Sequence, residues 1–299
     1  MAGNSSSFKP REERDPFNAR LTDVPYPGEF DLEATLNSGQ VFHWRRRGEG
    51  WEGMIGDAPC YVVQESADLR VHGVTVETAQ RYFGLDHPLA EIIASFPNDE
   101  AMNTAVAACR GLRIIRQPLW ECVATFITSA QKAVPHITQI SHTLRSRYGR
   151  RVEWGGGAAY AYPTPDALAA LSEEDLRSCA LGYRAKNLRK AAEMVASGTV
   201  DLEEVTRMND LEAHAALCRL AGVGPKVANC ALLFAFERLS AFPIDVWIER
   251  VLRTLYFAGK RRVTTKRLQQ FSAKYFGPYG GYAQQYLFHH ARMQKKAGA

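Results

Sequence analysis

The segment LCRLAGVGPKVANCALLFAF, residues 217–236, most limits what this chain can fold into. Apolar residues at helical spacing run into Gly222-Val223-Gly224, and Pro225 suits the first turn of a second helix. Two glycines one residue apart permit a tight turn with positive φ and leave backbone N–H groups uncovered. The segment therefore predicts two helices joined by a hairpin, with an anion site at the start of the second helix. A lone pair of glycines would favour an ordinary helix–turn–helix corner instead.

Lys226 and Asp245 are the two candidate chemical groups near this hairpin. Lys226 falls in the first turn of the second predicted helix, where a positive charge opposes the helix macrodipole unless it serves a function. Its amine could contact a phosphate or act as a nucleophile. Asp245, after Pro243 and before an apolar helix, is first of all an N-cap, but a carboxylate can also stabilise a cationic sugar. The 19 residues from Lys226 to Asp245 fit a helix and a return, which would bring both into one cleft.

The bulk composition is that of an ordinary soluble protein of one large or two smaller domains. Of the 299 residues, 46% are hydrophobic and 23% charged, and no run approaches the roughly 20 apolar residues that span a bilayer. The six cysteines show no CxxC or His/Cys metal spacing, which favours free thiols in a reduced intracellular compartment. We therefore expect no metal, no cofactor and no membrane association.

The spacing of apolar residues along the chain predicts an α+β fold. An N-terminal antiparallel β-sheet domain is followed by a mainly α-helical helix–hairpin–helix domain. Residues 1–20 are polar and are expected to be a disordered lead-in; residues 21–108 form the β-rich domain and 109–299 the helical one. The predicted strands are FDLEATL, QVFHWRRR, WEGMIG, PCYVVQE and LRVHGV. Helical spacing starts at about Thr78, and DALAALSEEDLRSCAL is predicted to be one helix. Gly155–Gly157 is predicted to be a surface loop.

LAGVGPKVA followed by FPIDVW resembles the signature of the helix–hairpin–helix DNA glycosylase superfamily. In its lysine-bearing members a lysine attacks C1′ of the sugar and an aspartate assists. The resemblance therefore implies that Lys226 and Asp245 are the catalytic pair and that Gly222 and Gly224 bind DNA.

Four further segments resemble the 8-oxoguanine DNA glycosylase family, in a similarity that covers nearly the whole chain from about residue 28. They are NSGQVFHW, RGLRIIRQPLWECVATFITSAQ, LGYRAK and GPYGGYAQQYLF. The resemblance implies that the Gly39 carbonyl accepts the N7–H found only on the oxidised purine, and that Gln284 bonds the base edge. Cys230 and Phe288 would pack against its two faces. Taken singly, each position has an ordinary structural explanation; together and in order they match the family.

The same resemblance implies DNA contacts that replace the extruded base. Tyr183 would wedge into the stack and Arg184 would read the orphaned cytosine. This chain departs from the family at three further expected DNA contacts, with Gln131 for asparagine, His136 for arginine and Trp247 for histidine. Because histidine is shorter than arginine and not permanently charged, we expect weaker discrimination for cytosine opposite the lesion.

These features together predict a base-excision-repair glycosylase that removes 8-oxoguanine, with an associated lyase that works through a Lys226 Schiff base. Ring-opened purines are left open as further substrates. The expected partner is double-stranded DNA containing an oxidised purine, bound by a monomer inside the cell, in a bacterial nucleoid or a eukaryotic nucleus. Two alternatives stay open: a monofunctional alkylated-base glycosylase, and a non-catalytic hairpin protein that only binds DNA. A purely structural helical protein would leave the lysine at the helix start unexplained.

Overall fold

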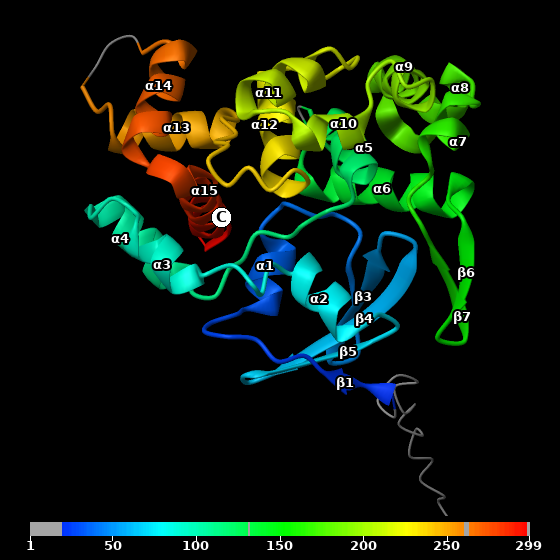
Figure 1. Cartoon of the computed structure of the whole chain (residues 1–299), viewed down its shortest axis with the longest axis horizontal. Helices are drawn as coiled ribbons and strands as arrows, with labels where there is room; N and C mark the ends of the chain where they lie inside the picture. Colours follow the sequence, from blue (N-terminus) through cyan, green and yellow to red (C-terminus); the bar gives the residue numbers. More distant parts are fainter. Residues whose placement is uncertain (1–19, 131, 260–262, 298–299) are drawn as a thin grey trace, which may run out of the picture.

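A computed structural model of the chain describes residues 20–130, 132–259 and 263–297 (Figure 1). Its N-terminal part is a five-stranded antiparallel sheet in the order β1-β5-β4-β3-β2. The strands are β1 (Thr22–Asp23), β2 (Arg45–Arg47), β3 (Gly50–Ile55), β4 (Ala58–Glu65) and β5 (Asp68–His72). The lead-in predicted for residues 1–20 lies outside the described residues except for its last residue.

Helices make up most of the remaining chain. The first six are α1 (Leu32–Asn37), α2 (Val76–Tyr82), α3 (Leu89–Ala94), α4 (Glu100–Ala108), α5 (Leu119–Ser129) and α6 (Val134–Tyr148). After a hairpin of β6 (Arg151–Trp154) and β7 (Gly157–Tyr160) come α7 (Pro165–Ala169), α8 (Glu173–Leu176), α9 (Arg184–Ala196), α10 (Leu202–Arg207), α11 (Asp210–Cys218), α12 (Pro225–Phe234), α13 (Val246–Leu255), α14 (Thr265–Tyr275) and α15 (Gly280–Ala297). Among the described residues, no helix is both long and apolar enough to cross a membrane. The predicted α+β class, sheet first and helices after, is confirmed.

The sheet part and the helical part each have a large apolar core of their own. The sheet core includes Trp44, Val62 and Val71, and the helical core includes Val123, Leu217 and Ala228. In Figure 1 the sheet lies below helices α5 to α14, with α1 and α2 at its own level; α15 packs against α4 and α13. The C-terminal helix α15 also lies next to the loop after α1, where Gln285 donates a hydrogen bond to the Ser38 carbonyl. The candidate site described below is built where these two segments meet. The boundary expected at residue 108 stays a prediction.

The strand predicted for FDLEATL is wrong, because this segment forms helix α1. Asp31 accepts a hydrogen bond from the backbone N–H of Ala34 at 2.7 Å and caps the helix. Leu32, Thr35 and Leu36 are buried, a helical rather than an alternating spacing. In the next predicted strand, QVFHWRRR, only Arg45–Arg47 pairs with a neighbour.

The single helix predicted for DALAALSEEDLRSCAL is also wrong. Ser172 ends the first run by starting a new helix, since its hydroxyl accepts from the Asp175 N–H while the Asp175 carboxylate accepts from the Ser172 N–H. The predicted loop at Gly155–Gly157 is instead the turn and first strand residue of the β6–β7 hairpin, in which Gly155 and Gly156 have positive φ.

A buried ion pair of the helical part lies beside His43, which belongs to the sheet part. Arg145 on α6 donates a hydrogen bond to Glu121 on α5, and both side chains are less than a tenth exposed. His43 Nδ1, from the sheet part, lies 3.4 Å from Glu121 Oε1, and His43 Nε2 lies 2.8 Å from the Met54 carbonyl oxygen. Burial holds the pKa of His43 well below its usual value and raises the pKa of Glu121.

Candidate active site

A cavity of about 950 Å³ lies where the hairpin, the start of α13, α15 and the loop after α1 meet. Nine of the thirteen residues predicted from the sequence line it: Gly39, Gly222, Gly224, Lys226, Cys230, Asp245, Trp247, Gln284 and Phe288. They come from segments up to 249 positions apart in the chain, from Gly39 to Phe288. This convergence marks the cavity as the candidate site.

The hairpin has the geometry expected of an anion site. Gly222 has a φ of +81°, and a Cβ there would lie 2.8 Å from Asn187 Cβ, so only glycine fits without a shift. Gly224 is the N-cap of α12, receives no side-chain cap, and is exposed. With Pro225 in the first turn and no acidic residue there, the helix offers exposed backbone amides to an anion.

Lys226 lies half-buried in the second position of α12 and faces aromatic and thiol groups. Its Nζ lies 5.1 Å from the centre of the Phe126 ring, close enough for a cation–π contact. Burial raises the pKa of the Cys230 thiol, although Lys226 lowers it in part. Cys230 is therefore a neutral packing group, which leaves the amine of Lys226 as the candidate nucleophile of the two.

Asp245 caps α13, as predicted. Its Oδ1 accepts hydrogen bonds from the N–H groups of Trp247 at 3.0 Å and Ile248 at 2.8 Å. Among the described residues, Oδ2 receives no hydrogen bond. Asp245 and Lys226 line the same cavity as Cys230, and Asp245 raises the pKa of the Cys230 thiol while Lys226 lowers it.

Gln284 and Phe288 present a polar and an aromatic group one helical turn apart on α15. Gln284 is 4% exposed, and its Oε1 has no hydrogen-bond partner among the described residues. A buried amide oxygen without a partner costs free energy, so an added donor at this point would be favourable. Opposite them Gly39 has a φ of +85°, and a Cβ there would lie 3.2 Å from Phe288 Cε1.

Three predicted DNA contacts that the structure describes, His136, Tyr183 and Arg184, do not line the cavity. His136 is exposed in the first turn of α6, and Gln131 lies outside the described residues. Tyr183 is 58% exposed at the start of α9, as a wedge requires. Arg184 is buried instead of projecting, since its guanidinium donates to the carbonyl oxygen of Ala130 and lies 4.3 Å from the Tyr183 ring centre.

Three of the cavity side chains that the sequence analysis did not single out bear on the site: Phe126, Arg292 and Lys295. Phe126 stacks on Phe234 with ring centres 5.5 Å apart and forms the wall beneath Lys226. Arg292 and Lys295 continue the face of α15 that carries Gln284 and Phe288. The helical spacing of 284, 288 and 292 was the available signal for Arg292.

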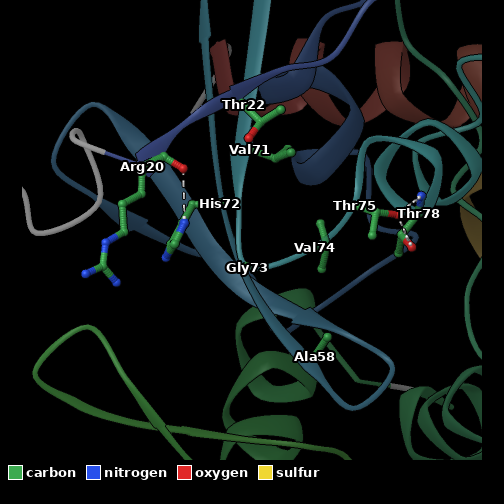
Figure 2. Close-up of a pocket in the computed structure, with 9 residues that line it drawn as sticks. All are labelled: Arg20, Thr22, Ala58, Val71, His72, Gly73, Val74, Thr75 and Thr78. Carbon is green, nitrogen blue, oxygen red and sulfur yellow. Dashed lines mark hydrogen bonds between the residues drawn. The ribbon is translucent and has the colours of Figure 1, made fainter.

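A second cavity lies beside strand β5, remote in sequence from the hairpin (Figure 2). It is lined mainly by residues 71–75 with Arg20, Thr22, Ala58 and Thr78, and its lining contains neither a lysine nor a carboxylate. His72 Nδ1 lies 3.2 Å from the Arg20 carbonyl oxygen there, and the His72 ring stacks on Trp154. The hairpin cavity, in contrast, joins the amine of Lys226 to the carboxylate of Asp245.

Comparison with protein families accounts for almost the whole described chain. Residues 24–123 match the family described as "8-oxoguanine DNA glycosylase, N-terminal domain". Residues 124–278 match "HhH-GPD superfamily base excision DNA repair protein", in which the hairpin and its lysine fall. The chain belongs to the 8-oxoguanine DNA glycosylase family.

Individual members of this family align along most of both chains. A probable N-glycosylase/DNA lyase of Methanothermobacter thermautotrophicus is 30% identical over 89% of this chain and 94% of its own length. The N-glycosylase/DNA lyase of Arabidopsis thaliana is 29% identical over 87% and 77%. The solved 8-oxoguanine glycosylase/lyase of Clostridium acetobutylicum, bound to double-stranded DNA with cytosine opposite 8-oxoguanine, is 31% identical, covers 92% and 98%, and has a TM-score of 0.86.

Proposed function

We propose that this protein removes 8-oxoguanine from duplex DNA and then cleaves the strand through a Schiff base on Lys226. The observation that carries the proposal is that Lys226, Cys230 and Asp245 line one cavity, together with Gln284, whose buried Oε1 has no hydrogen-bond partner among the described residues. The nucleophile, the carboxylate and the base-binding groups of a glycosylase/lyase thus occupy one chamber. Lys226 also argues against a monofunctional enzyme, which needs no amine.

DNA docking uses the hairpin first. The exposed amides at the start of α12 hold a backbone phosphate, and the glycines let that phosphate approach the main chain. The lesion base must leave the stack, which costs a few kcal/mol, and the vacancy must be filled. Tyr183, exposed beside α9, provides the wedge. Arg184 has to leave its contact with Ala130 if it is to meet the orphaned base.

Base recognition takes place between Cys230 and Phe288. The Phe288 ring supplies a stacking face and the neutral Cys230 thiol the opposite wall. Gly39 offers its carbonyl to N7–H, a donor that guanine lacks. Gln284 Oε1 gains the donor that it does not have in the free protein.

The chemistry follows from the amine and the carboxylate. The Lys226 amine attacks C1′ through the lone pair of Nζ, the bond from C1′ to the base breaks, and the departing base takes up the proton that Nζ loses on forming the new bond. The sugar ring opens to a Schiff base between C1′ and Nζ, and β-elimination then breaks the strand on the 3′ side. Asp245, whose Oδ1 is committed to the α13 cap, stabilises the positive charge on the sugar through Oδ2.

The proposed activity is tested by borohydride trapping on a duplex with 8-oxoguanine opposite cytosine. A covalent protein–DNA adduct is expected on this duplex, and none on the same duplex with guanine. A duplex with 3-methyladenine tests the alkylated-base alternative. Release of 3-methyladenine with no adduct on 8-oxoguanine would overturn the proposal.

Replacing Gln284 by leucine should separate recognition from stability. Because the substitution removes an unpartnered buried oxygen, we expect the free energy of unfolding to change by less than about 1 kcal/mol. Excision of 8-oxoguanine should fall by about ten- to a hundredfold, since a hydrogen bond to the base edge is lost. Single-turnover rates and denaturant unfolding measure the two effects. Gln294→Leu, an exposed glutamine of the same helix, is the control and should change neither.

In this proposal, His136 determines how strongly the enzyme prefers cytosine over the other three bases opposite the lesion. Excision opposite each of the four bases should show only a weak preference for cytosine. His136→Arg should raise the preference by at least about fivefold, since arginine supplies a planar pair of donors. Gln139→Arg adds the same charge one turn further along α6 and serves as the control. A strict cytosine preference of the unmodified protein would contradict this role.

We propose that the protein acts inside the cell, where its substrate DNA is found. We also propose that it acts as a monomer, since one chain carries every group used above.

A further inference from the structure

Arg292 lies beside Phe288 and Gly39, two of the residues that hold the base in the proposed function. It follows Phe288 by one turn of α15 and lines the same cavity. Its Cζ lies 5.4 Å from the centre of the Phe288 ring. A Cβ built on Gly39 would lie 2.6 Å from Arg292 Nη1, so the guanidinium touches the backbone at Gly39.

The loop that carries Gly39 does not need Arg292 to hold its shape. Gln285 Nε2 donates to the Ser38 carbonyl at 3.0 Å. Gln40 Nε2 donates to the Arg113 carbonyl at 2.8 Å, and Gln117 Nε2 donates to the Gln40 carbonyl at 2.8 Å. Both neighbours of Gly39 are therefore anchored by buried amides. The contact of Arg292 Nη1 with the Asn37 carbonyl, at 3.5 Å, is too long to add much.

The guanidinium lies in a setting that favours an additional acceptor. Burial lowers the pKa of Arg292, although the Asp245 carboxylate acts in the opposite direction. Among the described residues, Arg292 forms no ion pair with a carboxylate. A partly desolvated guanidinium keeps its charge and gains when an acceptor approaches. An acceptor that enters the cavity beside Gly39 would meet it.

The oxidised purine brings such acceptors to this point. In 8-oxoguanine the N7–H is flanked by the carbonyl oxygens at C8 and C6, so the edge reads acceptor, donor, acceptor. The Gly39 carbonyl can match only the central donor. Resting on the function proposed above, we infer that Arg292 is a further base-binding residue, whose guanidinium donates to a carbonyl oxygen beside N7–H.

The inference is tested by comparing two substrates in one series of variants. The substrates are a duplex with 8-oxoguanine opposite cytosine and the same duplex with a preformed abasic site, which has no base for Arg292 to bind. Arg292→Leu should lower single-turnover excision of 8-oxoguanine by about ten- to a hundredfold, since a charge-assisted hydrogen bond is lost. β-Elimination at the abasic site should change by less than about twofold, because Lys226 and Asp245 are untouched.

Arg292→Lys and Arg70→Leu complete the series. The lysine variant keeps the charge with a less suitable donor, so its loss of excision should be intermediate. Arg70, on β5, pairs with Glu65 and does not line the cavity, so Arg70→Leu should leave both rates unchanged.

The outcomes separate failure of this inference from failure of the proposed function. Equal losses on both substrates would mean that Arg292 holds the DNA backbone or the fold and would overturn the inference. Unchanged rates on both would mean that the guanidinium only packs in the cavity, which also overturns it. If the unmodified protein cleaves abasic DNA but releases no 8-oxoguanine, the proposed function itself is wrong.

Discussion

Replacing Lys226 by glutamine is expected to abolish the borohydride-trapped adduct and to lower base excision by at least about a thousandfold. Glutamine is similar in length to lysine but has no amine to attack C1′ or to form a Schiff base. The backbone amides of the hairpin are unchanged, so the variant should still bind the lesion duplex. Trapping, single-turnover excision and a binding titration on one 8-oxoguanine duplex measure the three properties.

Lys274→Gln is the matched control, since it removes an exposed lysine on α14 that does not line the cavity. It should retain excision and the adduct. Excision that survives in Lys226→Gln without an adduct would indicate a monofunctional enzyme. Binding with no excision even by the unmodified protein would favour the non-catalytic DNA-binding alternative.

Replacing Glu121 by glutamine should lower the free energy of unfolding by about 3–5 kcal/mol, because it leaves the buried Arg145 charge without its carboxylate. Arg145 keeps a hydrogen bond to the Tyr160 carbonyl, but that oxygen carries no full charge. The loss should affect the junction of the sheet part with the helical part, where His43 approaches Glu121. Denaturant unfolding followed by circular dichroism measures the change.

Glu153→Gln is the control for this effect. Glu153 pairs with Arg151 at the surface, with more than half of each side chain exposed, so its loss should have little effect on the free energy of unfolding. If the two variants are equally stable, the Glu121–Arg145 pair is not a net contributor and the burial argument fails. A Glu121→Gln variant that unfolds earlier but cleaves abasic DNA normally at low temperature would place the effect on stability alone.

Local sequence determined the parts of the site that depend on neighbouring residues. Gly222, Gly224 and Pro225 predicted the hairpin and the open start of α12, because backbone φ and a missing N–H are properties of single residues. Asp245 was predicted as an N-cap, and it caps α13 through amides two and three positions later. The order of these motifs along the chain predicted membership of the 8-oxoguanine DNA glycosylase family, and the comparisons with known proteins confirm it.

Two secondary-structure predictions from local sequence were wrong, at segments where the pattern of apolar residues was a weaker signal. FDLEATL was predicted as a strand because it lies among β-rich segments, but the Asp31 cap and the buried face of α1 prevailed. Ser172 split a helix that apolar spacing alone would have continued. In both cases one side-chain cap, which satisfies backbone amides, outweighed the average pattern of the segment.

Only the tertiary structure decided which distant groups share the cavity. Gly39 and Arg292 are 253 positions apart, and their contact depends on how α15 packs against α4, α13 and the loop after α1. The buried state of Arg184 depends likewise on the Ala130 carbonyl, 54 positions away. A sequence pattern records the preferences of a chain segment, whereas contacts of this kind arise when separate apolar faces are buried together. The sequence by itself thus determined the hairpin and the helix cap and predicted the catalytic pair, and packing decided which other groups line the cavity.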